Sequence, residues 1–295
     1  MDNRSIDLIL TSGKEKDKRV IEISKSSKYK LTSIEGIESS DIDLSLTDNS
    51  QYDGKVVNSK RISGRTIDIA AEYVGGEFQK VREDLISFFN PKNEGCLKVI
   101  LREDDKEVVR EINFEIESFK IVQDNIYSPL AFKISIVCPD PFFKDEHSTE
   151  KVIAVWEGGV KFPFKFDLKF KHKTKDEEKK GAILRVNGHI ETPVEIEFEG
   201  PAKNPCVKNA TTNEFIKVKR DILEGEVLFI NTAYGNKKVI IKSEGKNKNA
   251  FNYIDLNSTF FSLRPGDNLI QYFNDDVKLT EQNVKIKYKN NYLGI

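Results

Sequence analysis

The sequence predicts a mainly β protein of two domains with one amphipathic helix. Apolar and polar residues alternate with a period of two along most of the chain, and a single stretch repeats with helical spacing. A proline-rich segment near the middle interrupts a strand, and 295 residues exceed the length at which one core usually keeps growing. We therefore expect a β-sandwich with the helix over residues 1–140 and an antiparallel β-sandwich over residues 141–295.

The first half consists of short alternating segments separated by charged or glycine-containing turns. The strands expected from this pattern are 6–10, 20–24, 29–37, 42–46, 67–73, 97–101, 108–116 and 132–138. A polar loop over 48–54 follows the fourth of them. The parity of the apolar residues changes near Ser118, which predicts a β-bulge there.

The one helical segment covers residues 78–89. Its apolar residues recur at steps of three and four, and they are Phe78, Val81, Leu85, Phe88 and Phe89. Gly75-Gly76 precedes the segment and Asn90-Pro91 ends it, as expected for a strand-to-helix turn and a helix stop.

The segment Cys138-Pro139-Asp140-Pro141-Phe142-Phe143 ends the last strand of the first half. Two prolines fix the backbone φ angle and remove two hydrogen-bond donors, so a regular strand cannot continue through it. We interpret Pro139, Asp140, Pro141, Phe142 and Phe143 as a stiff joint between the two domains, with both phenylalanines packed at the seam.

The second half has only β patterns, at intervals of about ten residues that are typical of an antiparallel sandwich or barrel. The strands expected are 194–198, 215–218, 222–223, 227–231, 239–242, 251–254, 268–272 and 284–288. Phe162, Phe164, Phe166 and Phe170 also alternate with charged residues. This pattern favours a core face, and the alternative is an aromatic platform that stacks against sugars.

Composition excludes several classes of function. Residues 1–143 hold 21 basic and 26 acidic residues, and the remainder holds 26 and 22, so neither half has the basic excess of a nucleic-acid-binding protein. No segment has the apolar length of a signal peptide or a membrane span. Three cysteines without CxxC spacing indicate buried thiols in a reducing compartment.

The motifs of catalysis and metal binding are missing from the sequence. The three histidines show no metal-ligand spacing, and Asp41-Ile42-Asp43-Leu44 lacks the glycine and glutamate of a calcium loop. Glu195 and Glu197 could serve as a glycosidase carboxylate pair. Their alternation with apolar residues favours another interpretation, in which they form the solvent-exposed face of a strand. We expect no enzyme activity, cofactor or metal.

The order of motifs along the whole chain resembles the distal tail proteins of long-tailed bacteriophages. The matching segments are Asp41-Ile42-Asp43-Leu44 with Tyr52-Asp53-Gly54, Gly64-Arg65-Thr66-Ile67 leading into the helix, the joint at 138–143, the turn and strand at 231–239, Asn252-Tyr253-Ile254-Asp255, Phe261-Ser262-Leu263-Arg264-Pro265-Gly266-Asp267-Asn268, and Tyr292-Leu293-Gly294-Ile295. None of these is a catalytic motif, so the resemblance concerns fold and assembly.

The resemblance implies a homohexameric ring formed by the N-terminal domain, with a galectin-like C-terminal sandwich projecting outward. Such a ring joins the tail tube protein to a tail-tip or tail-associated lysin-type protein and to a receptor-binding protein, at the virion tail tip after assembly in the host cytoplasm. The residues expected at the ring interface are Asp48, Tyr52, Asp53, Gly54, Lys55, Phe78 and Arg82. The alternative function is a carbohydrate-binding module of a tail-tip or cell-wall-associated protein.

Overall fold

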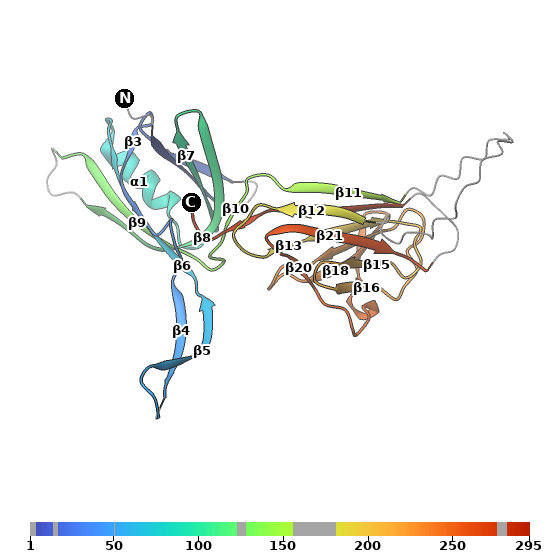
Figure 1. Ribbon diagram of the computed structural model, residues 1–295. Helices are drawn as coiled ribbons and strands as arrows, with labels where there is room; N and C mark the ends of the chain where they lie inside the picture. The colour runs from blue at the N-terminus through green and yellow to red at the C-terminus, as the bar shows by residue number, and fades with distance from the viewer. Residues whose placement is uncertain (1–3, 14–16, 50, 123–127, 156–180, 276–281) are drawn as a thin grey trace, which may run out of the picture. The chain divides into compact units, whose positions relative to one another are not determined.

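The computed structural model describes residues 4–13, 17–49, 51–122, 128–155, 181–275 and 282–295 (Figure 1). Two compact units divide the chain: the first consists of residues 1–146 together with 291–295, and the second of residues 147–290. Both units are built from β-strands, and one α-helix is present among the described residues. The mainly β fold class with one helix is confirmed.

The first unit is a nine-stranded sheet that curls and closes on itself. Its strands, in spatial order, are β23 (Asn291–Tyr292), β10 (Phe143–Lys144), β8 (Lys106–Val122), β7 (Gly95–Glu103), β1 (Ser5–Ser12), β2 (Arg19–Ile23), β3 (Tyr29–Glu35), β6 (Arg65–Tyr73) and β9 (Leu130–Cys138). Strand β8 pairs with β7 through its first half and with β9 through its second half, so the expected sandwich is a closed, barrel-like sheet. The register shifts between Ile116 and Ser118, which confirms the predicted bulge.

Helix α1 (Phe78–Phe88) packs its C-terminal half into this closed sheet. Leu85, Phe88 and Phe89 are buried, and the Phe89 N–H donates to the Leu85 carbonyl to close the last turn. The helix terminus leaves carbonyl groups that need donors. Ser12 Oγ donates to the Phe88 carbonyl at 2.9 Å, which fastens the end of the helix to β1.

A separate two-stranded ribbon leaves the closed sheet of the first unit. Strands β4 (Ile42–Asp48) and β5 (Lys55–Ile62) pair with each other and with no other strand among the described residues. We call residues 41–63 the arm, and Figure 1 shows it projecting from the first unit. The sequence pattern predicts β4 but gives no signal for β5, whose apolar and polar residues do not alternate.

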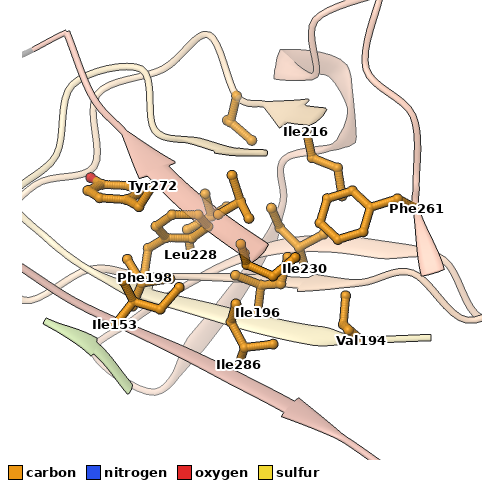
Figure 2. Close-up of a cluster of buried hydrophobic side chains, with 14 of the residues drawn as sticks. Ile153, Val194, Ile196, Phe198, Ile216, Leu228, Ile230, Phe261, Tyr272 and Ile286 are labelled. Carbon is orange, nitrogen blue, oxygen red and sulfur yellow. The ribbon is translucent and has the colours of Figure 1, made fainter. Parts of the chain in front are cut away.

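The second unit is an antiparallel two-sheet structure. One sheet has the order β11 (Thr149–Val155), β22 (Gln282–Tyr288), β14 (Glu195–Glu199), β17 (Val227–Asn231), β18 (Lys238–Ser243) and β19 (Lys246–Asn249). The other has the order β12 (Gly181–Val186), β21 (Gly266–Phe273), β15 (Cys206–Asn209) and β16 (Glu214–Lys217), and β13 (Thr192–Pro193) pairs with β20 (Ser262–Leu263). Figure 2 shows Phe198, Leu228, Ile230 and Tyr272 among the buried side chains of its core.

Two expected strands of the second unit are wrong. The expected strand 222–223 is not formed, and Ile222 makes only an isolated bridge with Ala202. Residues Phe251–Tyr253 form a short 3₁₀ helix, η2, instead of a strand. The Asn249 side-chain carbonyl accepts the Phe251 N–H at 2.9 Å, and this local bond favours a turn over a ladder.

Candidate assembly surfaces

Arg65, on β6, is a fully buried cation in the first unit, with 1% of its surface exposed. Its Nε donates to the Pro141 carbonyl at 2.9 Å, its Nη1 donates to the Gly36 carbonyl at 2.7 Å, and its Nη2 donates to the Leu293 carbonyl. The guanidinium also lies 4.9 Å from the centre of the Phe143 ring. One side chain thus joins the base of the arm, the proline segment and the C-terminal tail, and we call this set the Arg65 cluster.

Burial has two opposite consequences for the titratable groups at this cluster. It lowers the pKa of Arg65, but a guanidinium starts so high that it stays charged and keeps all its donors. It raises the pKa of the neighbouring Cys138 thiol to about 12, although the Arg65 charge opposes that rise. The cluster therefore pairs a permanent cation with a neutral thiol and main-chain carbonyls.

Two glycines allow the backbones at the Arg65 cluster to approach closely. A Cβ on Gly36 would lie 2.1 Å from the Thr66 carbonyl oxygen, and Gly36 has a φ of +87°. A Cβ on Gly294 would lie 1.9 Å from the Glu38 carbonyl oxygen. A side chain at Gly36 would push the end of β3 away from β6, and one at Gly294 would push the C-terminal tail away from residues 37 and 38.

The last five residues of the chain return to the first unit and close it. Tyr292 on β23 pairs with Phe143 on β10, and the Arg110 guanidinium lies 3.7 Å from the centre of the Tyr292 ring. Arg110 also pairs with Asp145 at 3.0 Å. The segment after the prolines is thus held in the first unit by strand pairing and by charge.

This closure corrects the placement of the joint residues. Pro139, Asp140, Pro141, Phe142 and Phe143 all lie within the first unit, and Phe143 is fully buried in its core. The first unit extends to Glu146, six residues beyond the expected end of the domain, because β10 still pairs with β8. The termination of β9 at Cys138 agrees with the proline argument.

The arm carries five of the residues expected at the ring interface. Asp48 and Lys55 form an ion pair of 3.2 Å at its tip, and Tyr52 is 73% exposed. Asp53 is also exposed, and Gly54 adopts a φ of +106° that suits glycine. These residues come together at one exposed turn, as their spacing predicts.

The arm also presents an uncovered apolar face that the alternation at 42–46 does not reveal by itself. Ile42, Leu44 and Leu46 are each about half exposed, and Val57 lies opposite Leu46 across the ribbon. The other face is polar and includes an Asp43–Arg61 ion pair of 3.0 Å. An isolated two-stranded ribbon is marginally stable in water, so this face is a candidate contact surface.

The remaining two expected interface residues lie on helix α1. Phe78 is 39% exposed and meets Tyr73 edge to face, with ring centroids 6.2 Å apart, and Arg82 is exposed. No described hydrogen bond or ion pair joins them to the tip of the arm. The structure therefore presents two separate candidate surfaces on the first unit.

In the second unit, the glutamates of β14 are balanced by partners on adjacent strands. Glu195 accepts a hydrogen bond from Asn231, Glu197 pairs with Lys242 at 3.2 Å, and Glu199 pairs with Lys285 at 2.6 Å. The alternate residues Val194, Ile196 and Phe198 are buried. The glutamates therefore lie on the polar, solvent-facing side of β14, as the sequence predicts.

Two other expectations concern ligands. The series Phe162, Phe164, Phe166 and Phe170 lies outside the described residues, so the sugar-platform alternative stays a prediction. No cluster of histidine, cysteine or carboxylate side chains suited to a metal ion occurs among the described residues. No helix in that part of the chain is long and apolar enough to cross a membrane.

Comparisons with known proteins point to the tails of bacteriophages. Residues 187–292 match the family model "Siphovirus-type tail component, C-terminal domain". A crystal structure of the SPP1 Dit (gp 19.1) protein, described as a paradigm of the hub adsorption apparatus in Gram-positive infecting phages, has a similar fold, with a TM-score of 0.63 at 11% identity over 96% of this chain and 99% of that chain. The resemblance to phage distal tail proteins is confirmed.

Further structures agree with this likeness of fold. A chain of the phage P2 baseplate in its activated conformation with Ca matches at a TM-score of 0.53 and 12% identity, over 96% of this chain and 97% of that chain. The corresponding structure with Sr gives the same values. No curated protein sequence matches the chain.

The sequence pattern misses Arg65 as the centre of its cluster. Gly64-Arg65-Thr66-Ile67 stands out as a motif in the sequence. The three carbonyl groups that accept hydrogen bonds from Arg65 are distant in the chain, so no local sequence pattern predicts them. The burial of Arg65 itself could have been predicted, because it alternates in step with Ile67 and Ile69 and therefore lies on the buried face of β6.

Proposed function

We propose that the chain is a structural component of a phage or phage-like tail tip, in which six copies form a ring that adapts the tail tube to the tip. The observation that carries this proposal is the match of residues 187–292 to a siphovirus-type tail component, together with the fold shared over 96% of the chain with a hub protein. The ring would engage the tube protein on one side and a tail-associated lysin-type protein, with a receptor-binding protein, on the other.

The first unit supports the ring assignment through its exposed arm. A closed ring needs two different surfaces on each copy, so that one surface of each copy binds the other surface of the next copy. The arm supplies a projecting surface with uncovered apolar side chains, including Leu44 and Leu46. Its tip, with Tyr52 and Asp53, and the exposed Phe78 and Arg82 of α1 are the proposed contact residues.

The oligomeric state in solution tests the ring. We expect light scattering and native mass spectrometry of the full chain to give a species of about 200 kDa, six times the 33.7 kDa of one copy. Negative-stain images of that species should show six-fold symmetry. A monomer at every concentration up to the millimolar range would contradict the ring.

The role in the tail needs a separate experiment, because many unrelated proteins form hexamers. Deleting the gene from the phage or prophage that encodes it should stop tail assembly or leave tails without a tip. Labelled antibody against the chain should mark the end of the tail tube. Labelling elsewhere on the particle would contradict the proposed location.

A further inference from the structure

The first unit is completed by residues that follow the second unit in the chain. Residues 291–295, the C-terminal tail, belong to the first unit, whereas residues 147–290, which precede them, form the second unit. The tail is largely buried: Asn291 and Tyr292 are 5% and 7% exposed, and Ile295 packs against the core of the first unit. The chain therefore supplies this part of the first unit only after the whole second unit.

The tail holds the segment that leads into the arm. Residues 36–40 connect the end of β3 with the arm, and we call them the connector. The Ile37 carbonyl accepts the Ile295 N–H at 3.2 Å. The backbone of Gly294 lies against the Glu38 carbonyl, with no room for a Cβ between them. The tail thus covers the backbone of the connector directly.

Arg65 joins the same two segments from below. Its guanidinium donates to the Gly36 carbonyl of the connector at 2.7 Å and to the Leu293 carbonyl of the tail. Among the described residues, the connector makes one further hydrogen bond, from Ser40 Oγ to the Pro141 carbonyl at a long 3.4 Å. The position of the connector therefore depends mainly on the buried Arg65 and on the tail.

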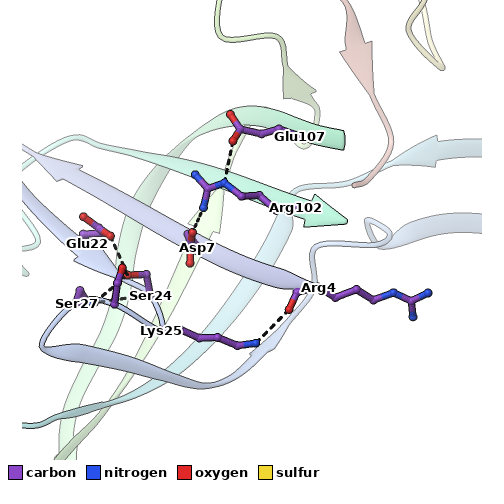
Figure 3. A network of polar contacts seen from close by, with 9 residues as sticks. Arg4, Asp7, Glu22, Ser24, Lys25, Ser27, Arg102 and Glu107 are labelled. Carbon is purple, nitrogen blue, oxygen red and sulfur yellow. Dashed lines mark hydrogen bonds and ion pairs between the residues drawn. The ribbon is translucent and has the colours of Figure 1, made fainter. Parts of the chain in front are cut away.

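The two ends of β3 are held by different kinds of contact. At its start, Ser24 Oγ donates to Glu22 at 2.8 Å, and the Ser27 N–H donates to Ser24 Oγ at 3.0 Å (Figure 3). Lys25 Nζ also donates to the Arg4 carbonyl at 3.1 Å. All of these partners precede β3 in the chain, so its start is fixed by local residues. Its end, where the arm begins, is fixed by the distant tail.

The second root of the arm is continuous with the sheet of the first unit. Strand β5 ends at Ile62, and β6 begins at Arg65 and pairs with β3 and β9 on its two sides. Ser63 N–H and Oγ both donate to the Asp41 carbonyl at 3.0 Å, which holds the two strands of the arm together at its root. An arm with one continuous root can turn about that root when its other root is released. The connector therefore sets the direction of the arm.

From these contacts we infer that the C-terminal tail is a latch, which fixes the connector and with it the arm. Domains fold as units during synthesis, the N-terminal one first, so the arm is made long before the tail that fixes it. A chain that is incomplete or misfolded in its second unit cannot place the tail, and its arm stays loose. Such a chain is kept out of any assembly that needs a fixed arm. This consequence rests on the proposed ring, whereas the latch itself does not.

Gly294→Val in the full chain tests the latch. The added side chain collides with the Glu38 carbonyl, so the tail separates from the connector. We expect the connector amides to exchange with deuterium about tenfold faster than in the wild type, with unchanged exchange in β17 of the second unit. Hydrogen exchange followed by mass spectrometry measures both. Leu293→Ala is the matched control, because it shortens a 38% exposed side chain and keeps the carbonyl that binds Arg65.

Each other result of this experiment overturns the latch. Fast exchange in the tail with unchanged exchange in the connector would mean that the arm does not depend on the tail. Loss of protection throughout the first unit would mean that the tail is an inseparable part of its core. Unchanged exchange in both segments would mean that the close contact of Gly294 is absent.

A milder variant keeps the test independent of the collision at Gly294. Ile295→Pro removes the N–H that donates to the Ile37 carbonyl, and we expect the connector amides to exchange about fivefold faster. Ile295→Val keeps this N–H and is the control. Equal exchange in the proline and valine variants would overturn the latch, because the hydrogen bond from the tail would then not hold the connector.

The oligomeric state separates the latch from the ring. If the wild type forms the proposed ring, Gly294→Val should raise the dissociation constant of the assembly about tenfold or more, since each copy must then order its arm on binding. A loosened connector with unchanged affinity would overturn the role of the latch in assembly. A wild-type chain that stays monomeric would overturn the ring, and hydrogen exchange would still decide whether the tail fixes the arm.

Discussion

Strands β4 and β14 have nearly the same sequence pattern and opposite surroundings. Both alternate acidic with branched or aromatic apolar residues, Asp-Ile-Asp-Leu in one and Glu-Ile-Glu-Phe in the other. Ile196 and Phe198 of β14 are at most 1% exposed, whereas Ile42 and Leu44 of β4 are each 53% exposed. Alternation therefore specifies a strand with two unlike faces, and the presence of a second sheet decides whether the apolar face is covered.

The polar faces of the two strands differ as well. Glu197 and Glu199 pair with lysines of the neighbouring strands β18 and β22. On the arm, Asp43 pairs with Arg61, and Asp41 has no described ion pair. We interpret β14 as a strand whose interactions are satisfied within one chain, and β4 as a strand whose interactions need a second chain.

Substitution of Ile196 by Asp should have the largest effect on stability. The change removes buried apolar contacts and places a carboxylate in the core of the second unit, so we expect a loss of about 5 kcal/mol or more in the free energy of unfolding. Urea denaturation followed by circular dichroism measures it. Equal unfolding midpoints for this variant and the wild type would contradict the claim that the apolar face of β14 is buried in the core.

Substitution of Arg65 by Met tests how the arm is held at its base. The methionine keeps much of the volume but leaves the Pro141, Gly36 and Leu293 carbonyls without their donor, and we expect a loss of about 3–5 kcal/mol. Thermal unfolding of the first unit, followed by fluorescence, measures it. Arg65→Lys is the matched control, because it keeps the charge and can satisfy fewer of the three carbonyls.

The outcome for Arg65→Lys also sharpens the comparison. We expect an intermediate stability, since a single ammonium cannot present the planar fork of a guanidinium. A lysine variant as stable as the wild type would show that the charge alone, and not the geometry of the three bonds, holds the segments together.

Cys138 gives a pH-dependent prediction for the same region. Its thiol releases a proton near pH 8.5–9 in the unfolded chain, and burial raises the folded pKa to about 12. The stabilising contribution is therefore complete below pH 8.5 and falls as pH rises toward 12, by roughly 1.5 kcal/mol between pH 8 and pH 10. Denaturation curves at several pH values, compared with those of Cys138→Ala, measure this difference in slope.

The elements with one clear period were predictable, and the contacts between distant segments were not. The helix at 78–88 and the bulge near Ser118 follow from spacing and parity in the sequence. The pairing of Phe143 with Tyr292 joins residues 149 positions apart, and no local pattern encodes it. Two-residue strands of this kind form because the surrounding unit brings them together.

Among the candidate assembly residues, the tip of the arm was easier to locate than its face. Gly54 and its polar neighbours mark an exposed turn in any sequence. Leu44 and Leu46 read as core residues, because alternation normally reports a covered face, and only the missing second layer shows otherwise.

Replacement of Glu197 by Gln should have a small effect. The carboxylate pairs with Lys242 and Lys287 at the partly exposed face of the second unit, and partly exposed pairs contribute about 0.5–1 kcal/mol. Urea denaturation at low and high salt measures it, and the difference between variant and wild type should shrink at 1 M salt. A loss above 2 kcal/mol would mean that this face is covered in the folded chain.

The smallest change in the stability of one copy is expected for Leu44→Asp combined with Leu46→Asp. Both side chains are about half exposed on the arm, so the free energy of unfolding of the isolated copy should stay within about 0.5 kcal/mol of the wild type. Self-association should nevertheless be lost, because the face that meets a second copy becomes acidic. Light scattering and urea denaturation on the same sample separate the two effects, and Thr47→Asp, on the polar face of the arm, is the control. A destabilised but still hexameric variant would show that the apolar face of β4 serves the fold of its own chain, as that of β14 does.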